Sequence, residues 1–178
     1  MKTSDVIIVG SGASGLFNAL FLPQDYKVIV ITKKEVEESD SFLAQGGISA
    51  LKNPEDYDSY FEDTMKAGHY ENDKGAVEKM IKESPQIIQD LKDFGVRFDL
   101  KDGEIEFTRE GGHSTFRILH HEDLTGKEIT SHLYEEAKKR DNITIMENCT
   151  MIDIIEKDGE CKGIVYKDAD GNLDTIEA

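Results

Sequence analysis

The sequence has few cysteines, no tryptophan, and far fewer basic than acidic residues. Among its 178 residues there are two cysteines, and 37 acidic residues against 21 basic ones give a formal charge of −16. Two cysteines are too few for a disulfide framework, and the spacing of Cys149 and Cys161 matches no zinc site. The strong negative charge disfavours nucleic acid and anionic membranes as partners.

The sequence also lacks a long apolar run. No stretch approaches the roughly 20 apolar residues of a membrane span, and the run at 6–9 is too short for a signal peptide. Hydrophobic residues still make up 38% of the chain, which supports a packed core. Together these features predict a cytoplasmic protein with reduced thiols, a single domain and no metal site.

The N-terminal region has the pattern of a βαβ unit. The β-branched run at 6–9 predicts a central parallel strand that is buried on both faces. Apolar positions within 12–22 predict a helix, and 27–32 predicts a second buried strand. This order predicts a Rossmann-like parallel sheet.

The C-terminal region has a different pattern. An amphipathic helix is expected at 126–140, before four runs of alternating residues. The runs are 143–147, 151–156, 163–167 and 173–176. Turns typical of tight hairpins join the last three. The whole chain is therefore predicted to be an α/β fold with an antiparallel β-meander appended to the parallel sheet.

The middle of the chain predicts two acidic helices, at about 55–68 and 74–93. The residues expected to face inward are Tyr57, Tyr60, Phe61, Thr64 and Met65 on the first, and Val77, Met80, Ile81, Ile87, Ile88 and Leu91 on the second. Gly95 is expected to end the second helix and to lead into a short strand at 96–100.

A glycine-rich turn after the first strand is the first candidate site. Gly10-Ser11-Gly12-Ala13-Ser14-Gly15 fits the dinucleotide fingerprint, in which a helix N-terminus holds a pyrophosphate. The acidic ribose ligand expected at the end of the second strand of NAD sites is missing, because that strand ends in Ile31-Thr32-Lys33-Lys34-Glu35. The alternative is a structural turn that binds no nucleotide, although the flanking strand and helix favour the nucleotide site.

A second candidate site is the segment Asp40-Ser41-Phe42-Leu43-Ala44-Gln45-Gly46-Gly47-Ile48. Adjacent glycines beside small residues let a backbone come close to a flat or phosphorylated ligand. A plain flexible loop explains the same composition. The composition leaves both interpretations open.

The third candidate site runs from Arg109 to His121, where the acidic trend is reversed. This segment holds two arginines and three histidines against one acid, Glu110. Such a local excess of positive charge suits an anionic substrate or cofactor. The alternative is a structural segment whose basic side chains pair with the acidic helices.

These motifs together resemble a known family. GSGASG at 10–15, AQGGI at 44–48 and TREGGHS with RILHHEDLTGKE at 108–128 resemble the L-aspartate oxidases of the succinate dehydrogenase and fumarate reductase flavoprotein superfamily. The resemblance runs through essentially the whole chain in the right order. It implies that FAD is the cofactor and that the turn at 10–15 holds its pyrophosphate.

The resemblance also implies further cofactor residues. Lys33 is expected near the cofactor, the segment Asp40 to Gly47 around the flavin, and the backbone of Thr150 and Met151 near the adenosine end. Respiratory members of the superfamily carry a histidine, to which FAD is covalently attached, where this sequence has Asp40. Non-covalent FAD is therefore expected.

Glu110 separates the oxidases from the respiratory enzymes in this resemblance. Aspartate differs from succinate by an α-ammonium group, and a carboxylate is its natural partner. Glu110 is therefore expected to orient L-aspartate, unless it only neutralises Arg109. The implied reaction produces iminoaspartate in the first step of de novo NAD biosynthesis. Oxygen or fumarate is the expected electron acceptor, and quinolinate synthase the expected next enzyme.

The family runs to several hundred residues. The resemblance therefore implies that residues 1–178 are the N-terminal part of an FAD-binding domain, without the capping and C-terminal helical domains. The proton-abstracting base is expected outside this chain, so the chain by itself is not expected to turn over substrate. A fragment of a fumarate reductase or succinate dehydrogenase flavoprotein and a non-catalytic dinucleotide-binding module are the alternatives.

Overall fold

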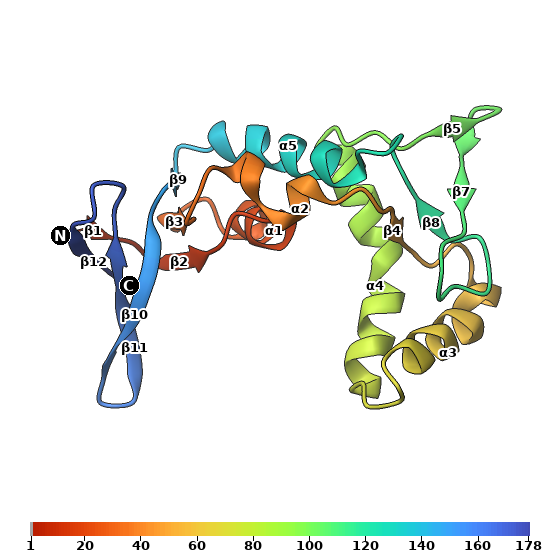
Figure 1. The fold of residues 1–178 in the computed structure, drawn as a ribbon, viewed down its shortest axis with the longest axis horizontal. Helices are drawn as coiled ribbons and strands as arrows, with labels where there is room; N and C mark the ends of the chain where they lie inside the picture. Colours follow the sequence, from red (N-terminus) through yellow and green to blue (C-terminus); the bar gives the residue numbers. More distant parts are fainter. Residues whose placement is uncertain (1) are drawn as a thin grey trace. The chain divides into compact units, whose positions relative to one another are not determined.

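The computed structural model describes residues 2–178, which form two compact units (Figure 1). The first unit takes in the chain up to Ala44 together with Ile129–Ala178, and the second is Gln45–Glu128. Helix α5 (Thr125–Lys138) runs across the second of these boundaries, close to the helix expected at 126–140.

A three-stranded parallel sheet lies in the first unit. Its order is β2 (Val6–Val9), β3 (Val28–Ile31), β9 (Ile143–Met146), and α1 (Ala13–Phe21) connects β2 to β3. The predicted βαβ unit is therefore confirmed. The expectation that β2 is central was wrong: β3 has a partner on each side and is buried throughout, whereas β2 pairs only with β3 in the described chain and Val9 is 55% exposed.

The two faces of β3 pack against different elements. Val28 and Val30 pack with Ala19 of α1, whereas Ile29 and Ile31 pack with residues of the C-terminal strands, because successive side chains of a strand point to opposite faces. That second cluster contains Cys149, Ile164, Tyr166 and Ile176. The core of this unit thus lies on both sides of the parallel sheet.

The predicted antiparallel meander is confirmed. Strands β10 (Thr150–Lys157), β11 (Glu160–Lys167) and β12 (Leu173–Glu177) pair in sequence order, and β1 (Lys2–Thr3) adds to β12 in parallel. The long β10–β11 hairpin is drawn in blue in Figure 1. Asp158 and Gly159 form its turn with positive φ angles of 57° and 81°.

The second unit contains the two predicted acidic helices. They are α3 (Tyr57–Ala67), preceded by the short helix η2 (Pro54–Asp56), and α4 (Lys74–Asp93). Their shared core is formed by Tyr60, Met65, Val77 and Ile81. Met80 was expected in this core but is 48% exposed, and Ser84 is buried in α4, where its Oγ accepts a hydrogen bond from the backbone of Leu51 at 2.8 Å.

Short strands complete the second unit. Strands β4 (Ile48–Ser49), β8 (Ile118–Leu119) and β7 (Phe107–Thr108) form an antiparallel sheet, and β5 (Leu100–Lys101) pairs with β6 (Glu104–Ile105). Gly95 follows α4 with a φ of 92°, as expected of the residue after a helix end. The strand expected at 96–100 is wrong except at Leu100, because the backbone of Asp99 bonds to His120 instead of joining a regular ladder.

Two short helices precede the second unit. They are η1 (Val36–Glu38) and α2 (Asp40–Leu43), and the side chain of Ser39 caps α2 by accepting from the backbone of Phe42. The start of the glycine-containing segment is thus a helical turn. Along residues 2–178, no helix combines the length and the apolar character needed to cross a membrane.

Candidate functional sites in the two units

A cleft of 490 Å³ opens in the first unit beside the carboxyl ends of the parallel strands. Its lining comes from the end of β2, the end of β3, the η1–α2 segment and the start of β10. The lining residues are Val9, Gly10, Ser11, Gly12, Ile31, Thr32, Lys33, Lys34, Glu35, Glu38, Ser39, Asp40, Ser41, Cys149, Thr150 and Met151. In open α/β sheets, this end of the strands is where ligands bind.

The glycine turn at the floor of the cleft is tightly packed. Gly10 has a φ of 111°, and its amide donates to the carbonyl oxygen of Ile31 at 2.8 Å. A Cβ on Gly15 would collide with the Gly10 carbonyl oxygen, and a Cβ on Gly12 would lie 2.8 Å from the Oγ of Ser41. Glycine is therefore required at Gly15 by close approach of the backbone and favoured at Gly10 by its positive φ, whereas at Gly12 a side chain would displace the Ser41 hydroxyl.

The N-terminus of α1 opens at this turn. Gly12 is its N-cap residue and provides no side-chain acceptor, and the first turn contains no acidic residue. The first amide groups of the helix therefore have no side-chain cap and carry the partial positive charge of the helix dipole. This arrangement suits a phosphate group.

The end of β3 forms hydrogen bonds to two other segments that line the cleft. The hydroxyl of Ser11 donates to Thr32 Oγ1 at 2.9 Å in a buried contact, and the carbonyl oxygen of Thr32 accepts from the amide of Cys149 at 2.9 Å. The strand end carries no acid, in agreement with the sequence. Three carboxylates nevertheless line the cleft: Glu35, which is the N-cap residue of η1, Glu38 of η1, and Asp40 at the start of α2. The closeness of Glu35 and Glu38 in sequence to the strand end was the signal that could have revealed them.

A second cleft, of 410 Å³, lies in the second unit and is rich in carboxylates. It is lined by Gln45, Gly47, Thr108, Glu110, His120, Glu122 and Asp123. Glu110 Oε1 accepts a hydrogen bond from the backbone amide of Gly47 at 3.2 Å. A Cβ on Gly47 would collide with Ile118 and with the carbonyl oxygen of Leu119, so glycine is needed to bring these segments together.

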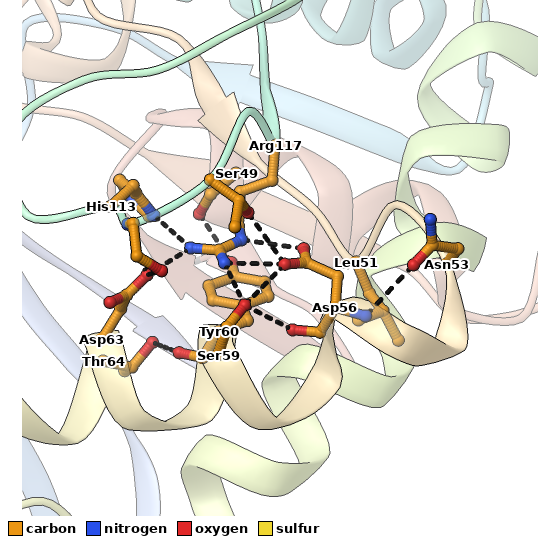
Figure 2. Close-up of polar contacts among 12 residues, drawn as sticks. Ser49, Leu51, Asn53, Asp56, Ser59, Tyr60, Asp63, Thr64, His113 and Arg117 are labelled. Carbon is orange, nitrogen blue, oxygen red and sulfur yellow. Dashed lines mark hydrogen bonds and ion pairs between the residues drawn. The ribbon is translucent and has the colours of Figure 1, made fainter.

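Arg117 is the most buried charge of the second unit (Figure 2). Its exposed fraction is 0%, and its guanidinium group bonds to Asp56 at 2.7 and 2.8 Å and to Asp63 at 2.6 Å. It also lies over the ring of Tyr60, with Cζ 4.8 Å from the ring centroid. These contacts hold the pKa of the Asp56 carboxyl at about 2 and raise the pKa of Arg117.

Within the basic segment 109–121, the charge of Arg117 is therefore balanced by acids of the fold. Besides Arg117, His120 and His121 lie 3.1 and 3.5 Å from carboxylate oxygens of Asp99. For Arg117 the prediction of an anion-binding site is wrong. The alternative, that the basic side chain pairs with acidic residues of the helices, is correct there. Arg109 lies over the ring of Phe116. Among residues 2–178, no ion pair joins Arg109 to Glu110.

The FAD binding domain family matches residues 5–178. The chain belongs to this family. Its cofactor is FAD, and the predicted α/β class with parallel and antiparallel strands is confirmed. The chain is 42% identical to L-aspartate oxidase of Clostridium perfringens and 45% identical to that of Clostridium acetobutylicum, over 93% and 90% of its length. It covers 38% and 37% of these relatives, which is less than two fifths of each.

The fold of this FAD-binding domain is also found among solved structures. Quinol fumarate reductase of Escherichia coli matches it with a TM-score of 0.93 and 26% identity, over 100% of this chain and 32% of that one. The resemblance to the flavoprotein superfamily that was drawn from the sequence motifs is thus confirmed. The identity to the aspartate oxidases is higher than to this fumarate reductase.

The first cleft of the FAD-binding domain has the features that the cofactor requires. The uncapped helix N-terminus and the side-chain-free backbone at Gly10 and Gly12 suit a pyrophosphate. The predicted cofactor residues that line this cleft are Gly10, Ser11, Gly12, Lys33, Asp40, Ser41, Thr150 and Met151. The lining residues that sequence reasoning missed include Val9, Glu35, Glu38, Ser39 and Cys149.

The other predicted cofactor residues lie outside this lining. Ala13, Ser14 and Gly15 belong to α1, and Phe42, Leu43 and Ala44 to the α2 segment of the first unit. Gln45, Gly46 and Gly47 begin the second unit, where Gln45 and Gly47 line the second cleft beside Glu110. Within residues 2–178, no group of three or more His, Cys, Asp or Glu side chains is placed to hold a metal ion.

Proposed function

We propose that this chain is the N-terminal part of an FAD-dependent enzyme that oxidises L-aspartate to iminoaspartate. The identity of 42–45% to two aspartate oxidases supports the reaction. Such an enzyme would catalyse the first step of de novo NAD biosynthesis. Further capping and helical domains and the catalytic base would lie outside this chain, and quinolinate synthase would consume the product.

In this proposal FAD lies non-covalently in the first cleft. The amides at Gly10–Gly15 hold its pyrophosphate, Lys33 lies near the cofactor, and the backbone of Thr150 and Met151 approaches the adenosine end. The segment Asp40–Gly47 lies along the flavin. Asp40 lines the cleft, and its carboxylate is not a nucleophile of the kind that forms a stable bond to the flavin, which supports a non-covalent cofactor.

Glu110 is the observation that carries the proposal for L-aspartate. One oxygen of its carboxylate accepts from the Gly47 amide at 3.2 Å, and the residue lines a cleft with two other acids, Glu122 and Asp123. Such a cleft favours a cationic group. The α-ammonium group is what distinguishes aspartate from succinate, so a site of this charge discriminates between them.

The chain's own contribution to the reaction is binding and orientation. When bound, FAD would supply the hydride acceptor, and oxygen or fumarate would be the final electron acceptor. Glu110 holds the α-ammonium group, and the Gly47 amide holds Glu110 in turn. Fixing the substrate at its ammonium group limits the orientations in which its Cα–H bond can be presented.

A first experiment tests the cofactor separately from the reaction. The purified chain is titrated with FAD and followed by flavin absorbance and fluorescence, with Gly12→Val as a variant that fills the turn. Saturable binding that is lost in Gly12→Val supports the cofactor site, and equal binding by both proteins contradicts it. Acid precipitation of the complex is expected to release all the flavin, because the attachment is non-covalent.

A second experiment tests the substrate in the complete protein that contains this domain. Flavin reduction is measured with L-aspartate and with succinate, in the wild type, in Glu110→Gln and in the exposed control Glu104→Gln. We expect L-aspartate to be preferred and Glu110→Gln to raise its KM by about tenfold, the effect of losing one charge-assisted contact. Oxidation of succinate in preference to L-aspartate would instead favour the fumarate reductase and succinate dehydrogenase type of enzyme.

A further inference from the structure

The loop that carries Glu110 lies between strand β7, which pairs with β8, and the residues that bond to Asp63 of α3. Residues 109–112 are exposed, and a Cβ on Gly111 or Gly112 would meet no atom within 4 Å. The amide of His113 donates to the Glu110 carbonyl oxygen at 3.2 Å and closes a turn in which Gly112 has a φ of 89°. A loop of this kind depends on its neighbouring residues for a fixed position.

The residues that follow the two glycines are held by α3. The amide and the Oγ of Ser114 both donate to Asp63 Oδ2, at 2.7 Å each, and Arg117 Nη1 donates to the same oxygen at 2.6 Å. The hydroxyl of Thr115 donates to Asp56 Oδ1 at 2.8 Å. One carboxylate oxygen of Asp63 thus receives three donors from a four-residue stretch.

The same network includes His113, as Figure 2 shows. Its Nδ1 lies 3.1 Å from Arg117 Nη1, and its ring is tilted against that of Tyr60, 6.1 Å away between centroids. Because a guanidinium group has only donors, this hydrogen bond requires Nδ1 to accept. The stretch from His113 to Arg117 is therefore bound to α3 through Ser114 and Arg117, and to Asp56 of η2 through Thr115 and Arg117.

Charge explains why Asp63 is present in addition to Asp56. Asp56 takes two hydrogen bonds from Arg117 and could balance its charge by itself. Asp63 adds a second negative charge that is only partly exposed, and the donors that satisfy it come from Ser114 as well as Arg117. Burial would raise the pKa of Asp63, but the hydrogen bonds from Ser114 and Arg117 lower it overall. The ionised carboxylate of Asp63 is thus stabilised by Ser114 of the loop as well as by Arg117.

We propose that Asp63 is a positioning residue for Glu110. By accepting hydrogen bonds from Ser114 and Arg117, it fixes the loop at 110–114. The Glu110 carboxylate then stays against the Gly47 amide and faces the ammonium group of the substrate. This inference rests on the proposed function for the identity of the substrate. Asp63 touches neither substrate nor cofactor and acts through the loop.

Amide hydrogen exchange tests the positioning without any reaction. The Gly47 amide bonds to Glu110, so its exchange rate reports how well the carboxylate is held. We expect Asp63→Asn to speed exchange at Gly47 and Ser114 by about tenfold relative to the wild type, while the α4 amides keep their rates. Asp58→Asn, an exposed acid on the same helix, is the control and should change neither. Unchanged exchange at Gly47 in Asp63→Asn would overturn the proposal.

Kinetics of the complete FAD-loaded protein test the consequence for specificity. Asp63→Asn is expected to raise the KM for L-aspartate about tenfold and to leave the inhibition constant of succinate, which has no ammonium group, within about twofold. A merely structural role would weaken both equally, and that result would refute positioning. In the Glu110→Gln background, Asp63→Asn should add no further loss, because interacting residues are not additive.

A milder variant guards against misfolding. Ser114→Ala removes only the Oγ donor and leaves the pair between Asp63 and Arg117 intact. It is expected to shift the KM for L-aspartate in the same direction by about threefold, without affecting succinate. A wild-type protein that does not oxidise L-aspartate would refute the proposed function, whereas the exchange of the Gly47 amide would still decide the positioning.

Discussion

Replacing Asp56 by asparagine tests the energetic role of the buried arginine network. Asp56 is buried and accepts from Arg117 at 2.7 and 2.8 Å, from Ser59 at 2.7 Å and from Thr115 at 2.8 Å. Hydrogen bonding by Arg117 is the main cause that lowers the Asp56 pKa to about 2 from the usual 3.8. This shift corresponds to about 2 kcal/mol of folding free energy at neutral pH.

The asparagine variant keeps the size of the side chain but loses the charge. Arg117, with no exposed surface, is then left with one carboxylate partner. Removing one partner of a buried ion pair typically costs about 3 kcal/mol or more, so the free energy of unfolding should fall by about 3 kcal/mol at pH 7. The exposed Asp58→Asn variant should change it by less than about 0.5 kcal/mol.

The pH dependence has a definite sign. A carboxyl whose pKa is lowered by folding stabilises the fold above its unfolded pKa, and this contribution is lost as the pH falls through the folded pKa. The stability difference between wild type and Asp56→Asn should therefore be constant above about pH 5 and shrink as the pH approaches 2. Urea unfolding followed by circular dichroism across this range measures it. A difference that does not change between pH 7 and pH 3, or that equals the Asp58→Asn effect, would refute the reasoning.

Three further predictions concern other parts of the fold. Gly15→Ala should lower the free energy of unfolding by about 2 kcal/mol or more and abolish FAD binding, because a Cβ would collide with the preceding turn. The control Gly111→Ala should change both properties little. Urea unfolding and flavin titration compare the two variants. Cys161 is exposed, whereas Cys149 is buried and burial raises the pKa of its thiol, so a thiol reagent should modify Cys161 quickly and Cys149 only on unfolding; equal rates would contradict this. Asp73 caps α4, so Asp73→Ala should cost about 1 kcal/mol in urea unfolding and Asp73→Asn much less.

The fold was largely predictable where the pattern is local. The βαβ unit, the helices at 57–67 and 74–93 and the meander followed from hydrophobic period and turn residues, which act within a few positions of the chain. The position of β2 at the edge of its sheet did not follow. A run of four β-branched residues is compatible with either place, and only the pairing partners decide which one a strand occupies.

The candidate sites were predictable to different degrees. The glycine turn was found because its glycines follow a local spacing, and at Gly15 the reason is the close contact with the Gly10 carbonyl group. Glu35 and Glu38 were missed, because η1 turns them toward the cleft and the strand pattern gives no sign of that turn. The roles of Glu110 and of the cofactor residues stay predictions for the experiments described above.

The sequence by itself determined the class of fold, the glycine turn after the first strand and the likeness to flavoproteins, because each is encoded by short segments of the chain. The tertiary structure decided what the basic segment at 109–121 does. Arg117 meets Asp56 and Asp63, which lie 61 and 54 positions away, and it is buried with Asp56 while Asp63 is partly exposed. The sequence gives the number of charged residues. The path of the chain decides which residues each charge contacts and how far it is exposed to water. These contacts and this exposure determine whether a charge binds a ligand or stabilises the fold.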